Sequence, residues 1–252
     1  MKRTAFLFAA IALSLSPTAA SAAPISIAAA VAAPTRTPDN VKLDESRKPA
    51  DVLTFFRLSK GMRVIDMFGA NAYWAEIMAP VVGPRGHVTV WQPTQFLNDE
   101  RRAKFAAFAK RQKNVSLISS PFEAPALGTS AYDFMIMNLD YHDVYWENPE
   151  RKIVRMNPDA WLKALYTAMK PGATVGIIDH VALPNGDTRA TVEKLHRIDP
   201  EVLKADFARA GFELVGVRNF LRNPADDHSK LVFDPAIRGH TDRVVYRFRK
   251  PR

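Results

Sequence analysis

The sequence of 252 residues contains no cysteine. Disulfide bonds, thiolate metal sites and a cysteine nucleophile are therefore excluded. The chain also lacks the G-x-S-x-G nucleophile elbow, the phosphate-binding loop and the H-E-x-x-H zinc motif. Hydrolase and kinase functions consequently find no support in the sequence.

The hydrophobic run at the start of the chain, Ala5 to Leu15, is too short to span a bilayer unassisted, because about 20 residues are needed. Lys2 and Arg3 precede this run, and the small-x-small sequence Ala20-Ser21-Ala22 follows it. This order predicts a Sec-type signal peptide over residues 1–22, with cleavage near Ala22. We therefore expect a periplasmic or secreted protein without stable membrane insertion; an uncleaved membrane anchor is the alternative.

Acidic residues are fewer than basic ones, 26 against 35, which gives a formal net charge of +9. Residues 1–22 hold two basic residues and no acidic one, so their removal leaves +7. The densest basic runs, "ERRAKFAAFAKRQK" and "RVVYRFRKPR", fit a solvated helix face and a chain end. We expect no nucleic-acid partner, because the other basic residues are scattered along the chain.

The remaining sequence divides into two parts by composition. Residues 23–45 are rich in Ala, Pro and Thr and predict a flexible linker, and residues 46–252 predict one domain. Within this domain strand-like and helix-like periods alternate. Strands are expected at 62–68, 87–92, 114–119, 132–139, 173–179, 212–221 and 242–250, and helices at 71–82, at 99–112 and after Asn157 and Asp199.

Strands that alternate with crossover helices form a parallel sheet covered on both faces. The last two strands have no helix between them, so one of them is expected to run antiparallel. The predicted fold is therefore α/β, a Rossmann-like, doubly wound, mostly parallel seven-stranded sheet with helices on both faces. Such a sheet binds its ligand beyond the C-terminal strand ends, where Asp66, Gln92, Asn138 and Asp179 fall.

Three segments carry a resemblance to a known family: "VIDMFGANAYWAEIMAPVVGPRGHV", "AYDFMIMNLDYHD" and "ALYTAMKPGATVGIIDH". Over about residues 46 to 250 the chain resembles the class I S-adenosylmethionine-dependent methyltransferases. The segments "HRIDPEVLKADFARAGFEL" and "LRNPADDHSKLVFDPAIRGHTDR" are similar to a group of exported bacterial predicted methyltransferases. The resemblance implies S-adenosylmethionine as cofactor and methyl transfer to a small-molecule substrate.

The resemblance also implies which residues hold the cofactor: Asp66, Phe68, Gly69, Ala70, Asn71, Ala72, Gln92 and Asn138. The loop after the first strand is usually glycine-rich, because glycine tolerates positive φ and lets the backbone approach a ligand closely. Here it holds one glycine, and an alanine forced to positive φ costs about 1 kcal/mol. Gln92 stands where the family has an acid for the ribose, so a charge-assisted hydrogen bond is lost.

These substitutions leave a second interpretation open. The chain is then an exported methyltransferase-like binding protein that has lost S-adenosylmethionine and holds another ligand in the same crevice. An aromatic side chain that fills the cofactor pocket, Phe68 or Trp74, would exclude the methyltransferase function.

The segment "NLDYHDVYW" at 138–146 supplies the candidate catalytic residues. His142 is predicted to act as general base, Tyr141 or Tyr145 to line the substrate slot, and His180 to contact the substrate. For both histidines the alternative is a structural role in anchoring a loop. No metal ligand is assigned, and the acids and histidine at 226–228 are interpreted as loop scaffolding in preference to a metal site.

His196 and Arg197 precede Asp199, the cap of the next helix, and are interpreted as structural residues, with a place facing the cleft as the alternative. Arg222, Arg238 and Arg243 either bind an anionic substrate or pair with neighbouring acids.

Overall fold

The computed structural model describes residues 23–184 and 186–252, so the predicted signal peptide lies outside the described residues. Its seven strands form one sheet in the order β3-β2-β1-β4-β5-β7-β6. Every neighbouring pair is parallel except those of β7, which runs antiparallel to both β5 and β6. The strands are β1 (Arg63–Met67), β2 (His87–Pro93), β3 (Val115–Ser120), β4 (Tyr132–Asn138), β5 (Met169–His180), β6 (Glu213–Arg218) and β7 (Arg243–Arg249). The predicted fold class is confirmed, including the antiparallel strand at the end.

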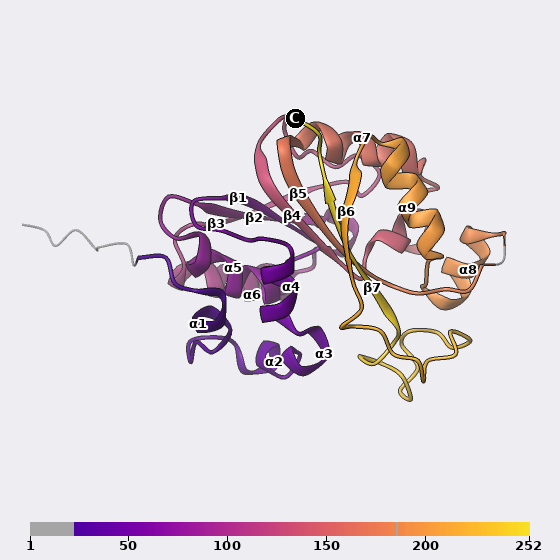
Figure 1. Ribbon diagram of the computed structural model, residues 1–252, viewed down its shortest axis with the longest axis horizontal. Coiled ribbons are helices and arrows are strands. Elements are labelled where there is room, and N and C mark those ends of the chain that lie inside the picture. Colours follow the sequence, from indigo (N-terminus) through magenta and orange to yellow (C-terminus); the bar gives the residue numbers. More distant parts are fainter. Residues whose placement is uncertain (1–22, 185) are drawn as a thin grey trace, which may run out of the picture.

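Helices cover both faces of this sheet (Figure 1). Successive strand residues point to opposite faces, so Val64 and Ile65 of β1 belong to two separate hydrophobic clusters. The cluster of Val64 includes side chains of α4 (Pro49–Phe55), α5 (Tyr73–Val82) and α6 (Asp99–Arg111). The cluster of Ile65 includes side chains of α7 (Pro158–Ala168) and α9 (Pro200–Arg209). The sheet thus lies between two packed layers of helices.

The segment predicted to be a flexible linker, residues 23–45, instead contains short helices and packs against the domain. It contains α1 (Ile27–Val31), α2 (Pro38–Val41) and the start of α3 (Asp44–Arg47). Glu76 of α5 is buried, and its carboxylate accepts hydrogen bonds from the backbone N–H of Thr37 and from Nδ2 of Asn40, the latter at 2.8 Å. A buried carboxylate needs such donors, so these helices satisfy a group of the domain core.

Two further differences concern the second half of the chain. β5 begins at Met169, four residues before its predicted start, because Met169 pairs with Tyr132 ahead of a register shift. Helix α8 (Thr188–Leu195) had no counterpart among the predicted elements.

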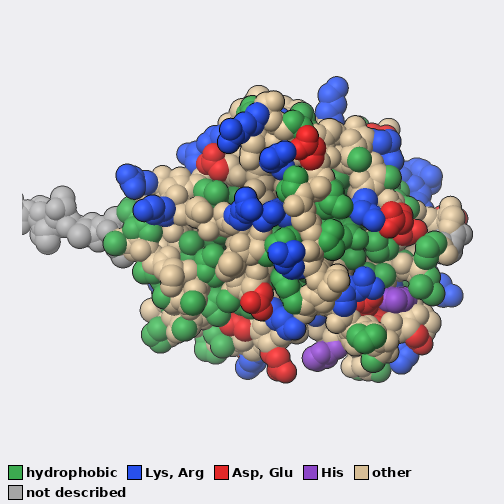
Figure 2. All heavy atoms as spheres, viewed as in Figure 1, with side chains coloured by type: hydrophobic (Ala, Val, Ile, Leu, Met, Phe, Trp, Pro, Cys, Tyr) green, Lys and Arg blue, Asp and Glu red, His purple; other side chains and the backbone are tan. Residues whose placement is uncertain are grey.

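None of the helices in the described part of the chain combines the length and the hydrophobicity that a membrane span requires. On the face that Figure 2 shows, Lys and Arg side chains are dispersed and form no single stripe.

The sheet topology fixes the place of the site. β1 lies between β2 and β4, so the strand order reverses there, and a crevice forms beyond the C-terminal ends of these strands.

Candidate functional site

A cavity of about 510 Å³ opens beyond the C-terminal ends of β1, β2, β4 and β5. Eight of the residues predicted for the site line it: Asp66, Phe68, Gly69, Asn71, Gln92, Asn138, His142 and His180. Ala70, Ala72 and Tyr141 do not. The volume falls within the range of small-molecule sites in proteins, about 300 to 1,000 Å³.

The loop between β1 and α5 holds two non-glycine residues in the left-handed region, Phe68 at φ 59° and Ala72 at φ 62°. Each costs on the order of 1 kcal/mol. The Phe68 ring packs edge-on against Trp91 and Phe122, with centroid distances of 5.3 and 5.2 Å. These contacts hold Phe68 in the cavity wall. Neither Phe68 nor Trp74 fills the cavity, because both line a space that remains open.

Gly69 allows the loop backbone to lie close to the Asp66 carboxyl group. A Cβ at this position would lie 2.3 Å from Cγ of Asp66 and 2.3 Å from its Oδ2. Any side chain would therefore displace the Asp66 carboxyl group, so the loop's only glycine stands where the β1 acid needs space.

Asp66 is 1% exposed, and its Oδ2 has no hydrogen-bond partner among residues 23–184 and 186–252. Burial raises the pKa of Asp66 from its ordinary 3.8 to about 8, because water no longer solvates the charged form. The buried indole Nε1 of Trp74 also lacks a partner in the described part of the chain. Both residues line the cavity, so an acceptor oxygen and an N–H donor that are both without a partner lie in the same wall.

Arg47, at the end of α3, adds a cation to this end of the cavity. Its guanidinium lies 4.3 Å from the ring centroid of Tyr73 and makes no hydrogen bond or ion pair within the described parts of the chain. Burial lowers the pKa of Arg47 from its usual range, and the charges of Asp140 and Asp66 oppose this shift. Arg47 was not predicted, because it precedes the first strand and lies next to a segment whose composition indicated a linker.

Gln92 fixes the loop from the neighbouring strand. Its Oε1 accepts a hydrogen bond from the backbone N–H of Ala70 at 3.1 Å, and the side chain is 1% exposed. The amide thus retains Nε2 as its donor for a ligand in the cavity.

Asp179 organises the opposite end of the cavity. This fully buried carboxylate accepts hydrogen bonds from the backbone N–H of His142 at 2.9 Å and of His180 at 2.8 Å. It also binds Nδ1 of His142 at 2.7 Å. Because a carboxylate only accepts, Nδ1 of His142 carries the proton and Nε2 points away from Asp179. Burial lowers the pKa of His142, but the charges of Asp179 and Asp143 outweigh it and raise this pKa to about 9.

Two further histidines lie beside His142. Nδ1 of His180 lies 2.6 Å from Oγ1 of Thr241, and burial followed by the charge of His142 lowers the pKa of His180 well below 6.5. His196 ends α8 at φ 49° and places its Nδ1 3.2 Å from Oδ1 of Asp143. The ring centroid of His142 lies 5.8 Å from that of His180 and 5.6 Å from that of His196. The alternative interpretation, in which His196 faces the cleft, agrees with its place in the cavity wall.

The predicted role of Tyr141 is corrected. Its side chain is fully buried, and its hydroxyl donates to Oδ2 of Asp206 at 2.6 Å. Tyr145 donates to the same oxygen, also at 2.6 Å. Asp206 is itself buried and requires these donors, so both tyrosines point into the protein and away from the cavity.

Several candidate residues belong to buried or partly buried ion pairs. Arg197 forms a buried bidentate pair with Asp226 at 2.8 and 3.0 Å, which agrees with the structural interpretation and not with the alternative place in the cleft. Arg222 pairs with Asp242 at 2.6 and 2.7 Å, and His228 contacts the same carboxylate at 2.9 Å. These contacts agree with the interpretation of residues 222–229 as scaffolding.

The long loop between β6 and β7 closes the cavity on one side. It contributes Val232 and Phe233, and the segment after β4 contributes Trp146. None of these three was predicted as a site residue. Apolar walls at this end provide a slot next to the histidines.

No family model matches the sequence, and no curated protein matches it. Solved structures do. An S-adenosylmethionine-dependent methyltransferase from Aquifex aeolicus superimposes with a TM-score of 0.56 at 18% identity, over 85% of this chain and 94% of that chain. The chain has the fold of S-adenosylmethionine-dependent methyltransferases.

Two other structures show the range of this fold. The 1,6-didemethyltoxoflavin-N1-methyltransferase of Burkholderia thailandensis, solved with S-adenosylhomocysteine, has a TM-score of 0.51 at 14% identity, over 85% of this chain and 80% of that one. The [4+2]-cyclase SpnF has a TM-score of 0.56 at 17% identity, over 82% of this chain and 81% of that one. One fold thus carries different reactions, so function has to be argued from the site.

Proposed function

We propose that the protein is an S-adenosylmethionine-dependent methyltransferase that acts on a small molecule. The observation that carries this proposal is a group of three polar side chains at the β1 end of the cavity, each with polar atoms that have no hydrogen-bond partner among the described residues: Oδ2 of Asp66, Nε1 of Trp74 and the guanidinium of Arg47. An amino-acid tail has an ammonium group and a carboxylate. Asp66 would bind the ammonium, and Trp74 and Arg47 would bind the carboxylate.

Other residues of the cavity fit the rest of the cofactor. Gly69 lets the loop backbone lie close to the tail, and Nε2 of Gln92 would donate to a ribose hydroxyl. When bound, S-adenosylmethionine supplies an electrophilic methyl group on a sulfonium. The chain would hold the acceptor at the other end of the cavity, between His142, His180 and the apolar walls of Trp146 and Phe233.

The orientation of His142 does not depend on substrate, because the buried Asp179 fixes both its backbone N–H and its ring. Preorganised groups of this kind lower the cost of aligning an acceptor. His142 therefore remains the predicted general base, and His180 the predicted contact to the acceptor.

We propose further that the mature protein is exported and begins at Ala23. The support is the sequence of residues 1–22, with its basic start, short apolar run and small-x-small site. Intact-mass measurement of the periplasmic chain tests this, since a retained segment would add the mass of residues 1–22. Export raises a question of cofactor supply, because S-adenosylmethionine is made in the cytosol, and it makes direct measurement of cofactor binding important.

Calorimetric titration of S-adenosylmethionine and S-adenosylhomocysteine into residues 23–252 tests the function. We expect micromolar binding that Asp66→Asn weakens at least about tenfold, the effect of losing one charge-assisted contact. Asp133→Asn is the matched control, because Asp133 pairs with Lys170 at 2.7 Å and does not line the cavity. Absence of heat at millimolar ligand, from folded protein, would favour the methyltransferase-like binding protein instead.

A further inference from the structure

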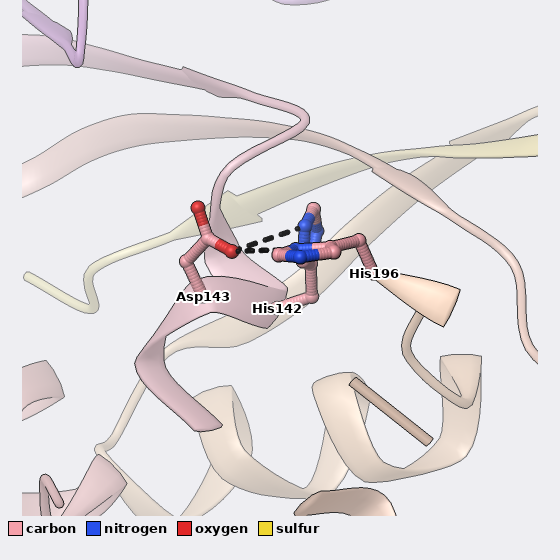
Figure 3. Close-up of side chains that lie close together, drawn as sticks. All are labelled: His142, Asp143 and His196. Carbon is pink, nitrogen blue, oxygen red and sulfur yellow. Dashed lines mark hydrogen bonds and ion pairs between the residues drawn. The ribbon is translucent and has the colours of Figure 1, made fainter. Parts of the chain in front are cut away.

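Three potential metal ligands converge at the acceptor end of the cavity. His142 Nε2 lies 3.3 Å and His196 Nδ1 lies 3.2 Å from the same oxygen, Oδ1 of Asp143. All three ligand atoms lie within 4.8 Å of one another. Figure 3 shows the Asp143 carboxylate directed toward both imidazoles, which come from the segment after β4 and from the end of α8.

These separations match the edges of a coordination polyhedron. Two ligand atoms that each lie about 2.1 Å from a metal are about 3.0 Å apart at 90° and about 3.4 Å apart at the tetrahedral angle. The distances from Oδ1 of Asp143 to the two imidazole nitrogens, 3.2 and 3.3 Å, fall between these values. Two of the three edges therefore have the lengths that a first-row divalent ion requires, and the third, between the two imidazole nitrogens, is at most 4.8 Å.

The hydrogen bonds around the cluster give a second, independent argument. Nδ1 of His142 donates to Asp179, which leaves Nε2 as the ring nitrogen that faces Asp143. A histidine whose other ring nitrogen donates to a buried carboxylate is the usual arrangement at metal sites, because it fixes the ring and the tautomer.

Burial completes the site. The side chains of His142, Asp143 and His196 are 3%, 16% and 13% exposed, so the cluster is largely shielded from water and still borders the cavity. Two imidazoles and one carboxylate form a set that binds zinc and other first-row ions in preference to magnesium, which favours oxygen ligands.

We propose that His142, Asp143 and His196 bind one divalent metal ion of the zinc class, with an open coordination position toward the cavity. This site is separate from the cofactor residues at the β1 end. The role of the ion in catalysis rests on the proposed function: the open position would take an anionic oxygen or sulfur of the methyl acceptor after its proton has passed to solvent. Methyl transfer then forms the bond from carbon to that atom, breaks the C–S bond of the sulfonium and leaves neutral S-adenosylhomocysteine.

The test is titration of Zn²⁺ into untagged, chelator-treated residues 23–252, with a parallel Co²⁺ titration followed by visible absorption. We expect one ion per chain and the absorption bands of low-coordinate Co²⁺. Asp143→Asn and His196→Asn should each weaken binding at least about tenfold and remove the bands. Asparagine is chosen at 196 because it tolerates the positive φ of this residue.

His228→Asn is the matched control. His228 also has a positive φ, 62°, and also contacts a carboxylate, that of Asp242 at 2.9 Å, but it does not line the cavity. This variant should bind both ions as the unchanged chain does. Circular dichroism and urea unfolding establish that every variant is folded.

The proposal is overturned if the folded chain binds neither ion more tightly than His196→Asn does. It is also overturned if Asp143→Asn and His196→Asn bind as tightly as the unchanged chain. A proton on His142 would then account for its contact with Asp143. These titrations contain no S-adenosylmethionine, so failure of the metal site and failure of cofactor binding are read from separate measurements.

Discussion

We expect the buried carboxyl of Asp66 to make the protein less stable as the pH rises from about 5 to about 8. Its pKa is raised from 3.8 to about 8 in the folded protein, so within this range the folded state holds a proton that the unfolded state has lost. The free energy of unfolding then falls by about 1.4 kcal/mol per pH unit. Over three units this amounts to about 4 kcal/mol, and to about half of that if water from the adjoining cavity solvates the charge.

Asp66→Asn isolates this effect, because an amide has nearly the same size and does not titrate. Urea unfolding of both proteins at several pH values gives the difference in the free energy of unfolding, in which the other titrating groups cancel. The difference should shift by about 2 to 4 kcal/mol in favour of the variant between pH 5 and pH 8. A difference that stays constant within about 0.5 kcal/mol would refute the electrostatic account of Asp66.

The affinity for S-adenosylmethionine should change with pH in the opposite direction to the stability of the free protein. An ammonium group beside Asp66 stabilises the ionised carboxylate, so binding of S-adenosylmethionine releases a proton below pH 8. Affinity should therefore rise with pH, by up to about tenfold per unit, and calorimetry in buffers of different ionisation enthalpy should detect the proton. In Asp66→Asn this pH dependence should disappear; if it persists, the ammonium group binds elsewhere.

Three further variants test other parts of the structure. Gly69→Ala places a Cβ 2.3 Å from the Asp66 carboxyl group, so it should lower the free energy of unfolding by about 1 to 3 kcal/mol and weaken cofactor binding in calorimetry. An unchanged affinity would contradict the argument that the loop backbone must lie close to the Asp66 carboxyl. Arg197→Met leaves Asp226 buried without its guanidinium partner and should cost about 3 to 5 kcal/mol, and a loss below about 1 kcal/mol would contradict the buried pair. Tyr141→Phe removes one hydrogen bond and should cost about 1 kcal/mol without changing cofactor affinity, whereas a loss of affinity would return Tyr141 to the site.

Most strands and the longer helices could be predicted, because the sequence patterns that indicate them are local. Helices were expected to begin after Asn157 and Asp199, and each of these side chains accepts a backbone N–H of the following helix. The helices between residues 27 and 47 could not be predicted in this way, because they are four or five residues long and show no apolar period. They are stabilised by contacts far along the chain, such as that of Asn40 with Glu76.

The site was predicted where it follows from strand ends and missed where it depends on loops. Asp66 and Gln92 lie near the C-terminal ends of β1 and β2, and His142 follows β4; the C-terminal ends of these parallel strands meet at one edge of the sheet. Tyr141 was assigned wrongly because neighbouring residues of a short 3₁₀ turn point in different directions: His142 binds Asp179, whereas Tyr141 points into the core. The metal cluster depends on the end of α8, a helix that the sequence pattern did not indicate.

A crystal structure determined from crystals of residues 23–252 soaked with S-adenosylhomocysteine tests most directly the claim that the cavity binds S-adenosylmethionine. We predict electron density for the ligand in the cavity, with its amino-acid tail at Asp66, Trp74 and Arg47 and its sulfur toward His142. An empty cavity at millimolar ligand, or a ligand bound with its tail away from Asp66, would contradict the assignment of this crevice as an S-adenosylmethionine site.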